Sequence, residues 1–117
     1  MTGSAEARRL IRSLVEKIVR EYRPEKVILF GSYAHDTPDE DSDIDLFIIK
    51  ETTERPIDRE IAVVTIVSDA HRLTPFDPHV MTPGEVRERL RMGDQFIREI
   101  IETGEVLYES PGIAASR

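Results

Sequence analysis

Two aspartates on alternate positions, Asp43 and Asp45, have the residue type and spacing to bind a cation. The apolar run of residues 44–49 predicts a buried strand that begins at these acids. Strand residues two apart point to the same face, about 6.6 Å apart along the backbone. Two unit charges about 6 Å apart repel by roughly 2.8 kcal/mol at an effective dielectric constant near 20. A solvated turn is the alternative, but a cation between the carboxylates would remove this cost.

A glycine–serine pair, Gly31-Ser32, precedes Asp43 by ten intervening residues. The pair follows the apolar residues 27–30, which predict another short strand that ends in a turn. Backbone N–H groups of such a turn, together with the Ser32 hydroxyl, can donate hydrogen bonds to phosphate oxygens. Beside two carboxylates, the turn predicts a site for a magnesium-bound phosphate chain.

The segment from Gly31-Ser32 to Asp43-Ile44-Asp45 resembles the signature of the nucleotidyltransferase superfamily that includes polymerase beta and kanamycin nucleotidyltransferase. The short chain is most similar to the minimal nucleotidyltransferases, small prokaryotic proteins that are often paired with a HEPN-domain protein. The resemblance covers residues 5–109. It implies an α/β fold of the α+β type, a small mixed β-sheet with flanking helices.

The resemblance also implies a reaction, the magnesium-dependent transfer of a nucleoside monophosphate, AMP from ATP, to a hydroxyl group. Gly31 and Ser32 would bind the triphosphate, and Ser42 would lie at the entry to the next strand in the same site. The acceptor would be a HEPN-domain toxin, which the chain would silence as its antitoxin. The alternative is a binding module of the same fold that neutralises its partner by contact alone. Association of the chain with copies of itself stays open.

Three acidic residues would bind two Mg²⁺ ions, according to the same resemblance. Asp43 and Asp45 supply two of them. Asp77 is the candidate for the third, because it lies in a short apolar run, residues 76–81, that predicts a strand. Its role would include accepting the proton of the acceptor hydroxyl. The alternative for Asp77 is a turn aspartate before a proline.

Two residues depart from the family pattern. Asp36 stands where a second glycine usually follows the serine, and it places a negative charge near an anionic ligand. Pro78 removes a backbone donor from the strand of Asp77, so that strand is expected to be short or to lie at the sheet edge. Both departures leave the three acidic metal ligands in place, but each is expected to lower the enzymatic activity.

Three histidines, His35, His71 and His79, have spacings that do not predict a metal site with the acids. His35 follows the phosphate turn. His79 shares a strand face with Asp77. For each of them, a structural or solvated role is the simpler interpretation.

Composition is that of one intracellular domain. The chain has 117 residues, 39% of them hydrophobic, and no cysteine. We expect one domain at residues 1–109 and a loose tail at 110–117. No apolar run reaches the length of a membrane span, and a signal-peptide pattern is missing, so we expect a cytoplasmic protein. The 16 basic and 23 acidic side chains give a net charge of −7, which argues against direct nucleic-acid binding.

Helices are expected around the predicted strands. Helical spacing of apolar residues or a capping pattern marks residues 5–23, a segment opened by Thr82 and Glu85, and residues 96–101 closed by Gly104. Residues 106–108 are expected to be extended. Residues 56–72 are ambiguous, because the β-branched run 61–67 suits a strand. The spacing of Ile57, Ile61, Val64 and Val67 suits a helix opened by Pro56, and the resemblance favours the helix.

Overall fold

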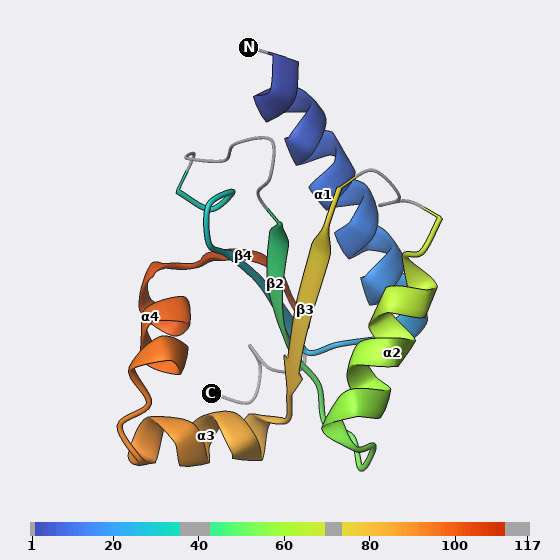
Figure 1. The fold of residues 1–117 in the computed structure, drawn as a ribbon. Helices are drawn as coiled ribbons and strands as arrows, with labels where there is room; N and C mark the ends of the chain where they lie inside the picture. Colours follow the sequence, from blue (N-terminus) through green and yellow to red (C-terminus); the bar gives the residue numbers. More distant parts are fainter. Residues whose placement is uncertain (1, 36–42, 70–73, 112–117) are drawn as a thin grey trace.

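The fold is a four-stranded sheet flanked by four helices (Figure 1). The structure is a computed structural model and describes residues 2–35, 43–69 and 74–111. Its elements are α1 (Thr2–Tyr22), β1 (Lys26–Phe30), β2 (Ile44–Ile49), α2 (Pro56–Ile66), β3 (Phe76–Met81), α3 (Pro83–Arg91), α4 (Gln95–Thr103) and β4 (Glu105–Glu109). In this part of the chain, no helix is both long and apolar enough to cross a membrane. The predicted mixed sheet with flanking helices is confirmed.

The strand order is β3-β2-β1-β4, and it brings the candidate site residues of three strands to one end of the sheet. β1 runs antiparallel to both β2 and β4. β2 and β3 are parallel, because α2 carries the chain back between them. The end of β1 and the starts of β2 and β3 therefore meet at the same end of the sheet, the upper end in Figure 1.

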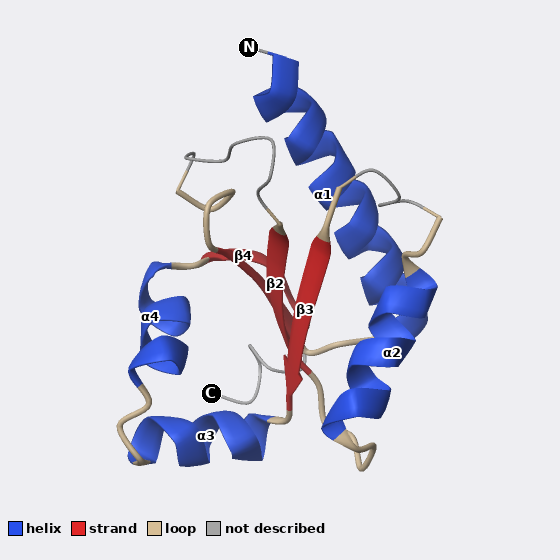
Figure 2. Ribbon diagram, viewed as in Figure 1, coloured by secondary structure: helices blue, strands red, loops and turns tan. Residues whose placement is uncertain are grey.

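Two layers of helices cover the sheet, one on each face (Figure 2). Alternation along β2 divides its residues between the faces. Ile44, Leu46 and Ile48 pack in a core with α1 and α2. Phe47 and Ile49 pack in a second core with α3 and α4. Asp45 has the same alternation as Phe47, so its carboxylate lies on the face of α3 and α4.

α2 is a helix, as the spacing and the resemblance predicted, but a different face of it packs against the protein. Ile57, Ile61 and Val64 are exposed, by 54%, 56% and 37%. Val67, the last residue of that spacing, is buried, and so is Val63, which the spacing did not include. The spacing therefore identified the helix correctly, but three of its four residues are exposed, because tertiary packing decides which side of a helix with apolar residues on several sides faces inward.

A buried arginine, Arg59, connects α2 to the elements that follow it. Arg59 is 5% exposed, and its Nη1 donates to Glu85 Oε1 at 2.7 Å. Its Nε donates to the Glu54 carbonyl oxygen at 2.9 Å. The hydrogen bond to Glu85 raises the pKa of Arg59, and the hydrogen bond from Arg59 lowers the pKa of Glu85. Glu85 also completes the capping box of α3 with Thr82, as the sequence predicted.

Gly104 ends α4, as the sequence predicted, and its role there is steric. Gly104 caps α4, but its φ is −71°, so it does not adopt the left-handed conformation typical of such caps. A Cβ atom at Gly104 would overlap Ile28 of β1 and the Ile100 carbonyl oxygen. Glycine is needed here because α4 enters β4 in close contact with the sheet, and the requirement is for space.

β3 lies at the edge of the sheet, as Pro78 predicted. It is not short, because its six residues pair with all six residues of β2. Pro78 is buried and lies opposite Leu46. The proline therefore leaves the strand of Asp77 intact.

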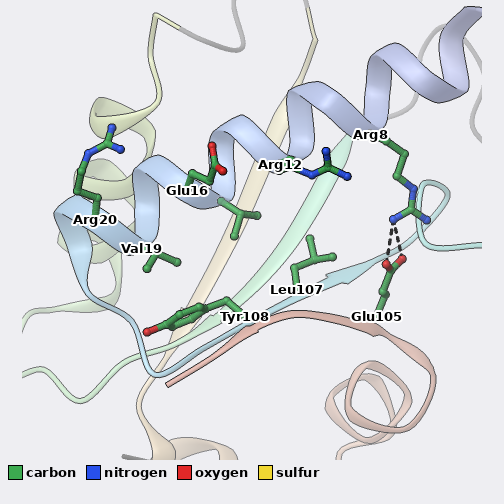
Figure 3. Close-up of a pocket in the computed structure, with 9 residues that line it drawn as sticks. Arg8, Arg12, Glu16, Val19, Arg20, Glu105, Leu107 and Tyr108 are labelled. Atoms are coloured by element: carbon green, nitrogen blue, oxygen red, sulfur yellow. Dashed lines mark hydrogen bonds and ion pairs between the residues drawn. The ribbon is translucent and has the colours of Figure 1, made fainter. Parts of the chain in front are cut away.

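A cavity with a volume of about 730 Å³ lies between α1 and β4 (Figure 3). An ion pair between Arg8 and Glu105, 2.9 Å long, closes one end of it. Leu107 and Tyr108 project from β4 toward α1. The cavity lies on the face of the sheet that α1 covers, the opposite face from Asp45. It is therefore separate from the carboxylates that the sequence singled out.

Candidate functional site

Asp45 and Asp77 lie opposite each other on neighbouring parallel strands. The register of β2 and β3 pairs the two residues directly, so their side chains share one face. Oxygen atoms of both carboxylates and a ring nitrogen of His79 lie within 4.8 Å of one another. Within the described ranges, these residues make the one such group of three potential metal donors.

His79 reaches the carboxylates because aromatic side chains hold its ring. The ring packs edge-to-face against Phe30 of β1, with centroids 5.4 Å apart, and against Phe96 of α4, with centroids 5.9 Å apart. Its Nε2 lies 3.3 Å from Asp77 Oδ2. Sequence reasoning did not assign His79 to the site. The signal that could have found it was the two-residue spacing from Asp77, which puts both residues on one strand face.

The turn after β1 brings the backbone of Gly31 directly against Asp45. Gly31 has φ +77°, a conformation that favours glycine. A Cβ atom there would overlap Asp45 Oδ2. The chain then makes one helical turn, in which Ala34 N donates to Gly31 O and His35 N donates to Ser32 O. Gly31 is therefore required for its conformation and for the approach of the turn to the carboxylate.

Asp45 is in an environment that disfavours its charge. Partial burial, first, and the neighbouring charges of Asp77 and then Asp43 raise the pKa of Asp45 from 3.8 to about 6. The nearby His79 acts in the opposite direction. Burial and like charges are both relieved by a bound cation, which would stabilise the carboxylate form.

The remaining predicted site residues take different places. Asp43 is exposed and immediately precedes β2, so it is outside the strand in which it was expected to share a face with Asp45. It is not one of the three donors that come together, although its charge acts on Asp45. Ser42, Asp36 and His71 lie outside the described residues.

A cleft of about 330 Å³ separates the turn at Gly31 from α4. Its volume falls in the range of small-molecule sites. The residues that line it come from β1, the turn and α4; they are Phe30, Gly31, His35, Phe96, Glu99, Ile100 and Thr103. The cleft shares Phe30 and Phe96 with the aromatic contacts of His79. A ligand in this cleft would lie beside the group of Asp45, Asp77 and His79.

The donor set fits a divalent cation. Two carboxylates offer the oxygen ligands that Mg²⁺ prefers, and Mg²⁺ takes its remaining ligands from water and phosphate. The third donor, an imidazole nitrogen, is a ligand for transition ions. The electrostatics of Asp45 support this fit. Its partial burial and the nearby charge of Asp77 both disfavour the ionised carboxylate, and a bound cation would offset both effects.

Several solved structures are similar to this chain in fold. A candidate nucleotidyltransferase from Sulfolobus solfataricus is 21% identical, with a TM-score of 0.59 over 93% of this chain and 89% of that chain. A toxin–antitoxin solved with AMP-PNP is 19% identical, with a TM-score of 0.60 over 90% of this chain and 78% of that chain. A toxin–antitoxin MntA–HpeT mutant, in which two aspartates are replaced by glutamate, is 18% identical with the same TM-score and coverage. These likenesses show the fold.

The sequence itself identifies the family. No curated protein is similar enough to count as a match. The family model described as polymerase beta, nucleotidyltransferase, matches residues 13–111. This match includes every strand, the glycine–serine turn and all three predicted acids. The chain therefore belongs to the polymerase beta nucleotidyltransferase family.

Proposed function

We propose that the chain is a magnesium-dependent nucleotidyltransferase that transfers AMP from ATP to a hydroxyl group on a partner protein. The observation that carries the proposal is the placement of Asp45 directly opposite Asp77, with the glycine–serine turn packed against Asp45. Family membership supplies the reaction class. The proposal of a protein acceptor is supported by two structures of similar fold, which are toxin–antitoxin assemblies.

Each residue of the site has a proposed task in this reaction. Gly31 and Ser32 hold the phosphates through backbone N–H groups and the Ser32 hydroxyl. Asp77 accepts the proton of the acceptor hydroxyl. The hydroxyl oxygen attacks the α-phosphorus of ATP, and the bond from that phosphorus to pyrophosphate breaks. Two divalent ions, bound by Asp43, Asp45 and Asp77, would stabilise the charge on the attacking and leaving oxygens.

The partner that we propose is a HEPN-domain toxin in the cytoplasm. The support is that two structures of similar fold are toxin–antitoxin assemblies. In this proposal, the toxin supplies the hydroxyl group that receives the nucleoside monophosphate. Modification would silence the toxin.

The test is co-expression of the chain with the protein encoded by the neighbouring gene, followed by intact-mass spectrometry of that protein. We expect the partner to gain one nucleoside monophosphate. In a purified mixture, the same modification should require ATP and a divalent ion. Asp77→Asn is the matched variant, because it keeps the shape of the side chain and removes its charge. Transfer should fall by two or more orders of magnitude, about 3 kcal/mol or more in the barrier.

The same experiment separates transfer from neutralisation by contact. If the unmodified partner is silenced by the wild-type chain, and Asp77→Asn silences it equally well, the chain is a binding module and the proposed reaction is wrong. Circular dichroism of Asp77→Asn checks that the variant folds, so that lost transfer is not the result of lost structure.

A further inference from the structure

His79 is the one histidine of the described residues that lies with the carboxylates of the candidate site. It comes from the same strand as Asp77 and lies opposite Phe47 of β2. Its ring is in contact with two phenylalanines from different elements, β1 and α4. These contacts restrict the ring and direct Nε2 toward Asp77. A nitrogen donor is therefore built into the site by the fold itself.

We infer that Asp45, Asp77 and His79 form a mixed nitrogen–oxygen site that binds a divalent first-row transition ion, such as Mn²⁺, more tightly than Mg²⁺. The inference deepens the proposed function, because it names the metal preference of the same site. The sequence pattern assigned only carboxylates to metal binding. The structure adds the imidazole.

The distances between the donors suit a shared ion. Ligands bound at about 2.1 Å in octahedral geometry lie about 3 Å apart when adjacent and about 4.2 Å apart when opposite. The observed separation of His79 Nε2 and Asp77 Oδ2 is 3.3 Å, and all three donor atoms lie within 4.8 Å of one another. Small side-chain movements would bring them to bonding distance.

The ligand type decides the preference between ions. Mg²⁺ prefers oxygen ligands and exchanges its waters reluctantly. An imidazole nitrogen binds transition ions better, and affinity for a site of this kind rises along the first row from Mn²⁺. Two carboxylates with one imidazole keep enough oxygen character to accept Mg²⁺. The imidazole should therefore add affinity for Mn²⁺ and little for Mg²⁺.

The alternative role for His79 is to donate a hydrogen bond to Asp77 and orient it. Both roles use Nε2, so an activity measurement alone does not separate them. A ligand nitrogen couples magnetically to Mn²⁺, whereas a nitrogen that only orients a carboxylate does not bond to the ion. Pulsed electron paramagnetic resonance detects this coupling directly.

The experiment uses the full chain without nucleotide, Mn²⁺ and Mg²⁺ as separate probes, and the variant His79→Phe. Phenylalanine keeps a ring against Phe30 and Phe96 and removes the nitrogen. We expect ¹⁴N modulation from a bound imidazole in the wild type and its loss in His79→Phe. We also expect the dissociation constant for Mn²⁺ to rise by about 10- to 100-fold in that variant, with little change for Mg²⁺. The matched control His35→Phe should keep the modulation.

Two results would overturn the inference. One is Mn²⁺ bound by the wild type without ¹⁴N modulation. The other is equal Mn²⁺ affinity in the wild type and His79→Phe. Neither result touches the proposed reaction, which is tested by transfer to the partner in the presence of Mg²⁺. Conversely, a chain that binds Mn²⁺ through His79 but never modifies a partner would leave the metal site standing and refute the transferase.

Discussion

Replacement of Asp45 by asparagine should stabilise the metal-free protein at neutral pH. Asp45 is partly buried, lies opposite Asp77 and has its pKa raised from 3.8 to about 6 by burial and by its acidic neighbours. A carboxyl group whose pKa is higher in the folded state favours folding only while it is protonated. Asparagine is uncharged at every pH, so it removes the unfavourable charge without a large change of shape.

The size of the effect follows from the pKa. A rise from 3.8 to about 6 corresponds to about 3 kcal/mol between the two protonation states. Because the side chain is only partly buried, solvent screening reduces the effect to about 1–2 kcal/mol. For a chain of this size, this corresponds to a rise of roughly 3–10 °C in Tm.

The pH dependence gives the prediction its sign. Below about pH 4, Asp45 is protonated in the folded and unfolded states, so the wild type and Asp45→Asn should have equal stability. As the pH rises from about 4 through about 6, the wild type loses stability relative to the variant, and the full difference is present above about pH 7. The difference in stability between the wild type and the variant cancels the titration of groups that do not interact with Asp45.

Urea unfolding in the presence of a chelator, from pH 4 to pH 8, measures this difference. The matched control is Asp58→Asn, which removes a carboxylate that pairs with Arg55 in the first turn of α2 at 2.9 Å. That change should destabilise the protein by about 0.5 kcal/mol or less. Added Mn²⁺ should then stabilise the wild type more than Asp45→Asn. A variant that is less stable than the wild type at pH 8 without metal would refute the electrostatic reasoning.

Three further changes test other parts of the structure. Gly31→Ala places a methyl group against Asp45 at a positive φ and should cost about 1–3 kcal/mol in urea unfolding; unchanged stability would contradict the close approach. Glu85→Gln leaves the buried charge of Arg59 without its counter-ion and should cost about 2–3 kcal/mol, whereas Arg59→Met should cost less because the carboxylate that it leaves, Glu85, is 41% exposed; equal costs would mean that solvent does not screen Glu85. Asp36→Gly should tighten ATP binding, measured by calorimetry, by about 1–3 kcal/mol, and an unchanged Kd would show that Asp36 does not approach the triphosphate.

The elements of this fold could be predicted because their signals are local. Short apolar runs gave the strands β1, β2 and β3, and the capping box of Thr82 and Glu85 gave the start of α3. The inward face of α2 could not be predicted in the same way. Arg59 on this helix is buried, and its partners lie 5 to 26 positions away along the chain. A pattern within one helix contains no information about them.

The candidate site was predictable only in part, for a related reason. The sequence places Asp43 beside Asp45 and His79 beside Asp77, but it does not state which residues of two parallel strands lie opposite each other. That register depends on the crossover through α2, and it pairs Asp45 with Asp77. The same register brings His79 into the group and leaves Asp43 outside it. Non-local pairing therefore decides which donors meet.

The electrostatics of Asp45 bear on the choice between an enzyme and a module that acts by contact alone. Asp45 lies in the central strand β2, where its neighbours Ile44 and Leu46 are fully buried. An uncharged residue at position 45 would avoid the unfavourable ionisation. The affinity for a partner bound by contact alone should not fall after such a replacement, because Gly31 covers Asp45 on one side. A function that needs the carboxylate, such as holding a cation beside a phosphate chain, gives this charge a use. The position of this charge therefore favours the transferase over the module.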